Sequence, residues 1–159
     1  MTPVIDLVLV TEVVLDRLRT LDGVTVYDSG VDTPLPISTD ADGVPDPAGR
    51  VGKYVVLYPG GTLGAGSDEE ADAADAHIDR LWTGSLVCSS GWRRDTQALV
   101  DDVHDLLHRW VPTIPEHPEL RCGRMKPPPG YNPGEVRRND QVEPPRFWLP
   151  LQWRLPITT

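Results

Sequence analysis

The stretch 146–155, RFWLPLQWRL, places the strongest constraint on what this chain can fold into. Its side chains alternate in the two-residue period of a β-strand. We expect one face to be buried, formed by Phe147, Leu149, Leu151, Trp153 and Leu155, and the other to be exposed or shared, formed by Trp148, Pro150, Gln152 and Arg154. A lone strand is not stable, so this stretch must join a sheet.

Pro150 refines that expectation, because proline has no N–H to donate to a strand ladder. It predicts a strand at the sheet edge or at the first contact with another chain. The strand also follows a proline-rich arm, residues 111–146, in which we find no periodic element. An arm that ends in an edge strand is suited to joining subunits.

The N-terminal stretch predicts a helix over residues 3–21. Thr2 and Pro3 suit the cap and first helical position, and Gly23 suits the end. The apolar side chains repeat at helical spacing, at Val4, Leu7, Val8, Thr11, Val14, Leu15 and Leu18. A strand is the alternative for this valine-rich start, but the charged residues lie off the stripe, as an amphipathic helix requires.

Three further strands and a second helix follow along the chain. We predict strands at 24–28, 54–58 and 81–90, and a helix capped by Asp95 that runs to Trp110. In the third strand, Trp82, Leu86 and Cys88 share one face. The 159 residues therefore predict a single α+β domain, with a mainly antiparallel sheet of about four strands and two helices on one face.

Charge is distributed unevenly along the chain. Residues 1–80 carry 15 acidic and 5 basic side chains, whereas residues 81–159 carry 9 acidic and 10 basic ones. The excess is greatest in the glycine- and alanine-containing segment 60–80, which predicts a solvated acidic loop or, in part, a short helix. Sequence-specific DNA binding is not expected, since neutralising phosphates needs Lys and Arg.

The residues with catalytic or metal-binding chemistry form no recognisable site. The loop GGTLGAGS at 60–67 lacks the lysine of a phosphate-binding loop. His104 and His108 have the spacing of two metal ligands on a helix, but two surface histidines are the simpler interpretation. Cys88 and Cys122 are expected to be free thiols. We expect neither an enzyme nor a cofactor.

Tryptophan and arginine indicate where partners would bind, because both are frequent in protein interfaces. Trp92, Arg93 and Arg94 form the site richest in these residues. Trp148 lies on the face of the last strand that we expect to be exposed. The interface candidates are therefore Trp92, Arg93, Arg94, Trp148, Pro150, Gln152 and Arg154.

Taken together, these segments resemble the tail terminator proteins of long-tailed, non-contractile bacteriophages, particularly those of actinobacterial hosts. The resemblance rests on the N-terminal helix and on five further segments. These are Val24–Tyr27, Lys53–Gly60, Leu86–Cys88, Leu106–Trp110 and Arg146–Leu155.

The resemblance implies a structural virion protein that forms a homohexameric ring. Such a ring caps the head-proximal end of the tail tube, stops polymerisation of the major tail-tube protein and joins the head–tail connector. DNA would pass through its pore without sequence-specific binding. The pore or rim candidates are Asp68, Glu69, Glu70, Asp72 and Asp75, because negative walls repel passing DNA.

Assembly is then expected in the host cytoplasm, with no membrane contact. Two other interpretations stay open. One is another neck or head-completion protein of the head–tail interface, which would share the small α+β architecture and ring symmetry. The other is a small enzyme or ligand-binding domain, which would require convergent polar groups in a pocket.

Overall fold

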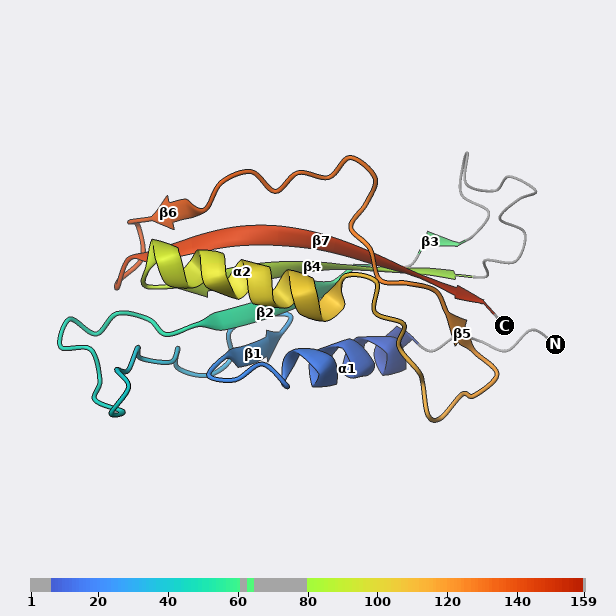
Figure 1. The fold of residues 1–159 in the computed structure, drawn as a ribbon, viewed down its shortest axis with the longest axis horizontal. Coiled ribbons are helices and arrows are strands. Elements are labelled where there is room, and N and C mark those ends of the chain that lie inside the picture. The colour runs from blue at the N-terminus through green and yellow to red at the C-terminus, as the bar shows by residue number, and fades with distance from the viewer. Residues whose placement is uncertain (1–6, 61–62, 65–79, 159) are drawn as a thin grey trace.

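A computed structural model describes residues 7–60, 63–64 and 80–158. Two helices and seven strands follow one another as α1 (Leu7–Leu18), β1 (Thr25–Asp28), β2 (Tyr54–Pro59), β3 (Leu63–Gly64), β4 (Arg80–Ser90), α2 (Arg93–Leu107), β5 (Arg121–Cys122), β6 (Arg137–Asn139) and β7 (Arg146–Thr158). The molecule is elongated, and the long β4–β7 pair runs along it (Figure 1). The α+β class expected from the sequence is confirmed.

The seven strands form one mixed sheet, in place of the four mainly antiparallel strands expected. The main order is β1-β2-β4-β7-β5, with β3 beside β4 and β6 beside β7. β1 and β2 are parallel, whereas β4 pairs antiparallel with both β2 and β7. The β4–β7 register runs from Arg80 opposite Ile157 to Ser90 opposite Phe147. The other side of β7 pairs only with β6 at Arg146–Trp148, with Lys126 at Arg154 and with β5 at Ile157 and Thr158. Among the described residues, the predicted edge position therefore holds over residues 149–153 and is wrong at the two ends of the strand.

Backbone direction explains how a strand containing Pro150 has neighbours on both sides. Arg154 and Lys126 exchange N–H···O=C bonds of 2.8 and 3.1 Å on the side of β7 away from β4. Because these groups alternate in direction along a strand, Pro150 and Pro156 also face away from β4. Neither proline therefore removes a hydrogen bond from the β4–β7 ladder.

The proline-rich arm folds back onto its own sheet. It contains two short strands, β5 and β6, which pair with the two ends of β7, so the expectation of an arm without regular elements is wrong. Ile114, Leu120 and Met125 of the arm are buried in the core. Within one chain, the arm is thus part of the domain.

Both helices pack on one face of the sheet, as predicted, and enclose the main core. In β7 the alternation predicted from the sequence is confirmed from Leu149 to Leu155, where every second side chain is buried. α1 differs from the prediction in two respects: it ends at Leu18 and not at residue 21, and Val8 is 67 % exposed while Val10, outside the predicted stripe, is fully buried. The predicted residues 3–6 of this helix lie outside the described part of the chain.

Two contacts fix the helices in place. Nε1 of Trp82 in β4 donates to Oγ1 of Thr11 in α1 at 3.1 Å, in a buried site. Arg17 of α1 donates through Nη2 to the carbonyl oxygen of Leu106 at 3.2 Å and lies over the Trp110 ring at 5.1 Å. An arginine thus links α1 to the end of α2.

The start of α2 differs from the prediction. Its N-cap is Trp92, which makes no side-chain capping bond, and Asp95 lies within the first turn. An acidic side chain still suits this position, because the helix N-terminus carries partial positive charge. The helix ends at Leu107, and Arg109 adopts a positive φ of 65° where the chain turns into the arm.

Candidate protein interface

Among the described residues, the segment between β1 and β2 covers one end of the sheet face opposite the helices. There, Tyr27, Val51, Tyr54 and Val56 form a second small core against the segment between β1 and β2, with Leu35 packed on it. Beyond this core, side chains of β4 and β7 lie half-buried or exposed. This uncovered region is the outer sheet face, and in it Thr83, Ser85 and Val87 lie opposite Arg154, Gln152 and Pro150.

The outer sheet face unites four of the predicted interface residues. Trp148, Pro150, Gln152 and Arg154 all lie on it, because they are alternate residues of one strand. Gln152 is exposed and the other three are half-buried. The prediction that these side chains share a face opposite the buried one is confirmed by the burial pattern.

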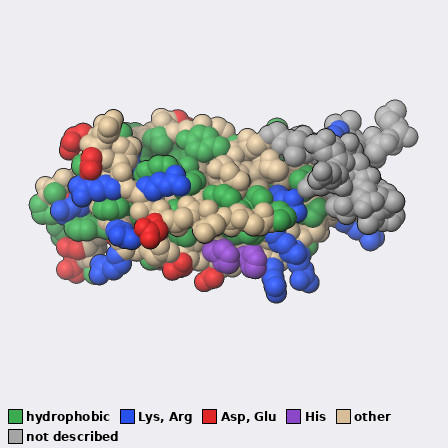
Figure 2. Space-filling model, turned by 90° about the horizontal axis from the view of Figure 1, so that it is seen from above, with side chains coloured by type: hydrophobic (Ala, Val, Ile, Leu, Met, Phe, Trp, Pro, Cys, Tyr) green, Lys and Arg blue, Asp and Glu red, His purple; other side chains and the backbone are tan. Residues whose placement is uncertain are grey.

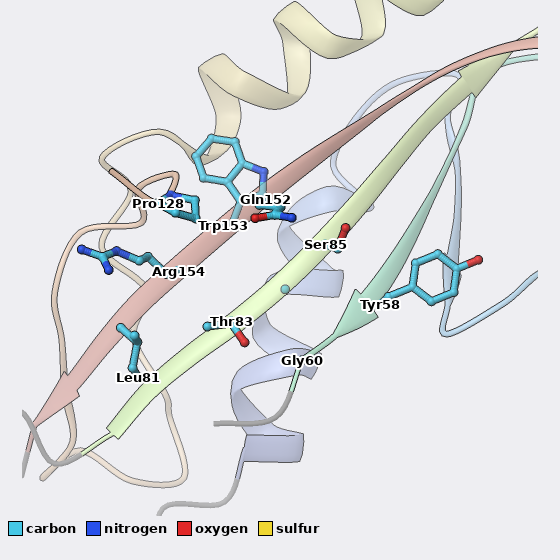
Figure 3. A pocket seen from close by; sticks show the side chains of 10 residues that line it. Tyr58, Gly60, Leu81, Thr83, Ser85, Pro128, Gln152, Trp153 and Arg154 are labelled. Carbon is cyan, nitrogen blue, oxygen red and sulfur yellow. The ribbon is translucent and has the colours of Figure 1, made fainter. Parts of the chain in front are cut away.

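A hollow of about 350 Å³ lies on the outer sheet face. Its walls include Tyr58 of β2, Thr83 and Ser85 of β4, Gln152 and Arg154 of β7, and Pro128 of the arm (Figure 3). The ring of Trp153, also at the margin, is directed toward α2. Among the described residues that line this hollow, apolar groups of Leu81, Pro128 and Trp153 adjoin the polar side chains, and no charged pair or nucleophile–base pair converges.

Stacked arginines border the outer sheet face where β7 begins. Arg137 of β6 lies over the Trp148 ring at 5.0 Å. Arg146 donates through Nη1 to the hydroxyl of Tyr54 at 3.2 Å. Such contacts restrain large side chains, which lowers the entropy that these side chains would lose in any further contact.

Trp92, Arg93 and Arg94 form a separate site. They lie at the start of α2, beside a hairpin of residues 37–51 whose backbone bridges join Ile37 to Val51 and Thr39 to Pro45. Arg50 stacks on the Trp92 ring at 4.0 Å. A second hollow, of about 390 Å³, lies between this ring and the hairpin.

The interface candidates therefore belong to two surfaces and not to one. Gln152 and Arg154 line the first hollow, and Trp92 and Arg94 line the second. The sequence analysis missed Arg50 and Tyr58. Tyr58 continues the alternation of Tyr54 and Val56, a signal that could have assigned it to the outer sheet face. The contact of Arg50 with Trp92 could not be predicted from the sequence pattern, because the two residues are far apart in the sequence and only the tertiary structure brings them together.

The pore or rim candidates Asp68, Glu69, Glu70, Asp72 and Asp75 lie outside the described residues. Of the acidic segment 60–80, the structure describes residue 60, the two residues of β3 and Arg80. β3 pairs with the start of β4, Leu63 opposite Leu81. The described residues of this segment therefore lie beside the first residues of β4.

Two histidines at the end of α2 and a buried cysteine are the next groups with reactive side chains. His104 and His108 stack with ring centroids 4.7 Å apart. The pKa of His108 is lowered by desolvation first, and then by the positive charge of its neighbours, including His104 and Arg109. Burial raises the pKa of the Cys88 thiol to about 12. The described residues contain no cluster of three or more potential metal ligands.

No described helix has both the length and the apolar character required to cross a bilayer. Comparison with known proteins adds no further constraint. No protein-family model matches this chain, and no curated protein sequence matches it.

Proposed function

We propose that this chain is a structural virion protein, a tail terminator of a long-tailed, non-contractile bacteriophage. In this proposal it forms a homohexameric ring on the head-proximal end of the tail tube. The ring occupies the growing end, stops addition of tail-tube protein and offers its other side to the head–tail connector. It works by binding and not by catalysis.

The observation that carries the proposal is the way the resembling segments come together. Val24–Tyr27, Lys53–Gly60, Leu86–Cys88 and Arg146–Leu155 are far apart in the sequence, yet they contribute to the adjacent strands β1, β2, β4 and β7. Leu106–Trp110 includes the end of α2, which packs on that sheet. Segments that form one contiguous unit are more persuasive than scattered matches.

The outer sheet face supplies a surface of the kind that such a role needs. It combines an apolar hollow with a polar rim, and aromatic side chains held by arginines border it. Interfaces commonly have this composition. In the proposed ring, the acidic segment 60–80 lines the pore or its rim, so that DNA passes without being held.

A second candidate is another neck or head-completion protein of the head–tail interface. The same fold and exposed surface serve it equally well, and the two differ in whether the protein acts on tube growth. The experiment must therefore include the matching tail-tube protein.

The test is electron microscopy and native mass spectrometry of the purified chain, alone and mixed with that tube protein. Six-fold rings and tubes capped at one end, with growth stopped, are expected. Rings that leave tube growth unchanged would favour the neck protein. A monomer in both samples, with normal tube growth, would contradict both candidates.

A paired substitution localises the contact. Gln152→Glu places a negative charge on the rim of the first hollow and is expected to weaken capping. Asp102→Lys, an exposed charge change on α2, is the control and should cap normally. Equal capping by both variants would exclude the outer sheet face as the contact with the tube.

A further inference from the structure

Four of the seven large apolar side chains that are exposed in the described part of the chain gather around the hairpin of residues 37–51. Ile37 and Val44 are 56 % and 55 % exposed, Trp92 is 38 % exposed, and Val31 is 47 % exposed in the preceding loop. We call Ile37, Val44 and Trp92, with the hollow that Val44 and Trp92 line, the hairpin surface. Contiguous exposed apolar patches mark interaction sites, and Val44 and Trp92 share one hollow.

The hairpin surface is also rigid and acidic. Backbone bonds from Ser38 to Arg50 and from Asp46 to Ser38, of 2.7 and 2.8 Å, hold the hairpin together. Between residues 28 and 51 the chain has five aspartates and one basic residue, Arg50, which pairs with Asp46 at 3.6 Å. Asp40, Asp46 and Asp95 line the hollow beside Trp92 together with one base, Arg94, so acidic side chains are in excess there. The occupant that fits is apolar with basic side chains.

The same chain presents such a surface near the opposite end of its long axis. There the turn after α2 and the segment 121–126, which begins with β5, carry the exposed side chains Arg109, Val111, Arg121, Arg124 and Lys126, which we call the β5 surface. Figure 1 shows the hairpin at one end of the molecule and β5 at the other. Figure 2 shows Lys and Arg side chains toward both ends, whereas Asp and Glu side chains gather toward the end opposite β5.

The β5 surface exposes an apolar side chain among basic ones, as expected of an occupant of the hairpin surface. Val111 is 49 % exposed, and four bases surround it in sequence. Segment 109–126 also contains two acids, Glu116 and Glu119, but Glu119 is engaged by Nδ1 of His117 at 2.9 Å. The excess of positive charge in this segment opposes the excess of negative charge on the hairpin.

We infer that the hairpin surface of one copy binds the β5 surface of the next copy, head to tail. The two surfaces are complementary in charge and both expose apolar side chains, yet their separation along the long axis prevents contact within one chain. The stacking of Arg50 on Trp92 at 4.0 Å illustrates how this ring accepts a guanidinium. A repeated head-to-tail contact closes into a ring when its rotation closes.

This inference deepens the proposed function, on whose ring it rests, by naming the interface between subunits. The test uses two charge-changing variants of the full chain. One carries Asp42→Arg and Val44→Arg in the hairpin, and the other carries Arg121→Glu and Arg124→Glu at β5. All four side chains are exposed. The control, Asp102→Lys with Asp105→Lys, changes exposed charges on α2.

Sedimentation velocity over a range of protein and salt concentrations measures assembly, and circular dichroism verifies folding. Each interface variant should raise the concentration needed for assembly by about tenfold or more, since like charges then face each other. Mixing the two variants should restore assembly, because each supplies the charge that the other surface now requires. The α2 control should match the natural chain, and added salt should weaken all assembly.

Three results overturn the inference: a natural chain that stays monomeric, interface variants that assemble normally, or a mixture that assembles no better than its components. The outcome is distinguishable from failure of the proposed function. If rings form by another surface and still cap tubes, only the interface is wrong. If the predicted contacts form but tube growth is unaffected, only the terminator function is wrong.

Discussion

The buried hydrogen bond between Trp82 and Thr11 provides the sharpest test of how the helices are held on the sheet. The indole is 1 % exposed and Thr11 is 7 % exposed, so neither group reaches water readily. Thr11→Val preserves the branched shape and has a similar helix propensity, but it leaves the indole N–H without its partner. An unsatisfied buried donor costs about 1–3 kcal/mol.

Equilibrium urea denaturation measures this loss directly. The free energy of unfolding should fall by about 1–3 kcal/mol in Thr11→Val. In a chain of this length, the melting temperature should fall by about 2–4 °C per kcal/mol. Thr113→Val is the control, because Thr113 is exposed, and it should change stability by less than about 0.5 kcal/mol.

A double-mutant cycle separates the hydrogen bond from the packing. Trp82→Phe removes the donor and leaves the Thr11 hydroxyl unsatisfied, whereas the double variant removes both polar groups. The double variant should therefore cost less than the sum of the two single variants. If the costs add to within about 0.5 kcal/mol, the two groups are not coupled and the reasoning is refuted.

Three further predictions concern the core. Trp153→Phe should cost less free energy of unfolding in urea than Trp82→Phe, because the Trp153 Nε1 is buried without a hydrogen-bond partner; an equal or larger cost would contradict this. Gly84→Ala should destabilise by about 1–3 kcal/mol in the same assay, because its Cβ would lie 2.5 Å from Cη2 of Trp82; a stability equal to that of the natural chain would show that the ring shifts freely. A thiol reagent at pH 8 should modify Cys122 well before Cys88, whose thiol is buried and has its pKa raised to about 12. Mass spectrometry of the digested protein measures the order of modification, and modification of Cys88 first would contradict the prediction.

The long elements could be predicted from the sequence because their periodicity is strong. β4 and β7 are 11 and 13 residues long, enough for alternation to define both faces. The short strands β5 and β6, of two and three residues, have no period to detect and exist only because β7 offers them a partner. The arm was therefore predicted to be irregular.

One part of the candidate interface could also be predicted from strand periodicity. Trp148, Pro150, Gln152 and Arg154 could be assigned to one face because they are alternate residues of one strand. The hairpin beside Trp92 could not be recognised in this way, because its side chains Ile37 and Val44 are exposed and therefore follow no core pattern. Pro150 indicated the free side of the strand correctly, but it could not show that arm segments of the same chain pair with the two ends of β7.

The two prolines of β7 have a consequence for assembly. Both remove N–H groups from the side of the strand that the arm covers only in short pieces, so an incoming strand would find no regular row of donors there. Uncontrolled growth of the sheet from chain to chain is thereby discouraged at this margin. In the proposed ring, copies of the protein would then recognise one another through side chains, and a contact of that kind can specify a fixed angle and stop at a fixed number of subunits.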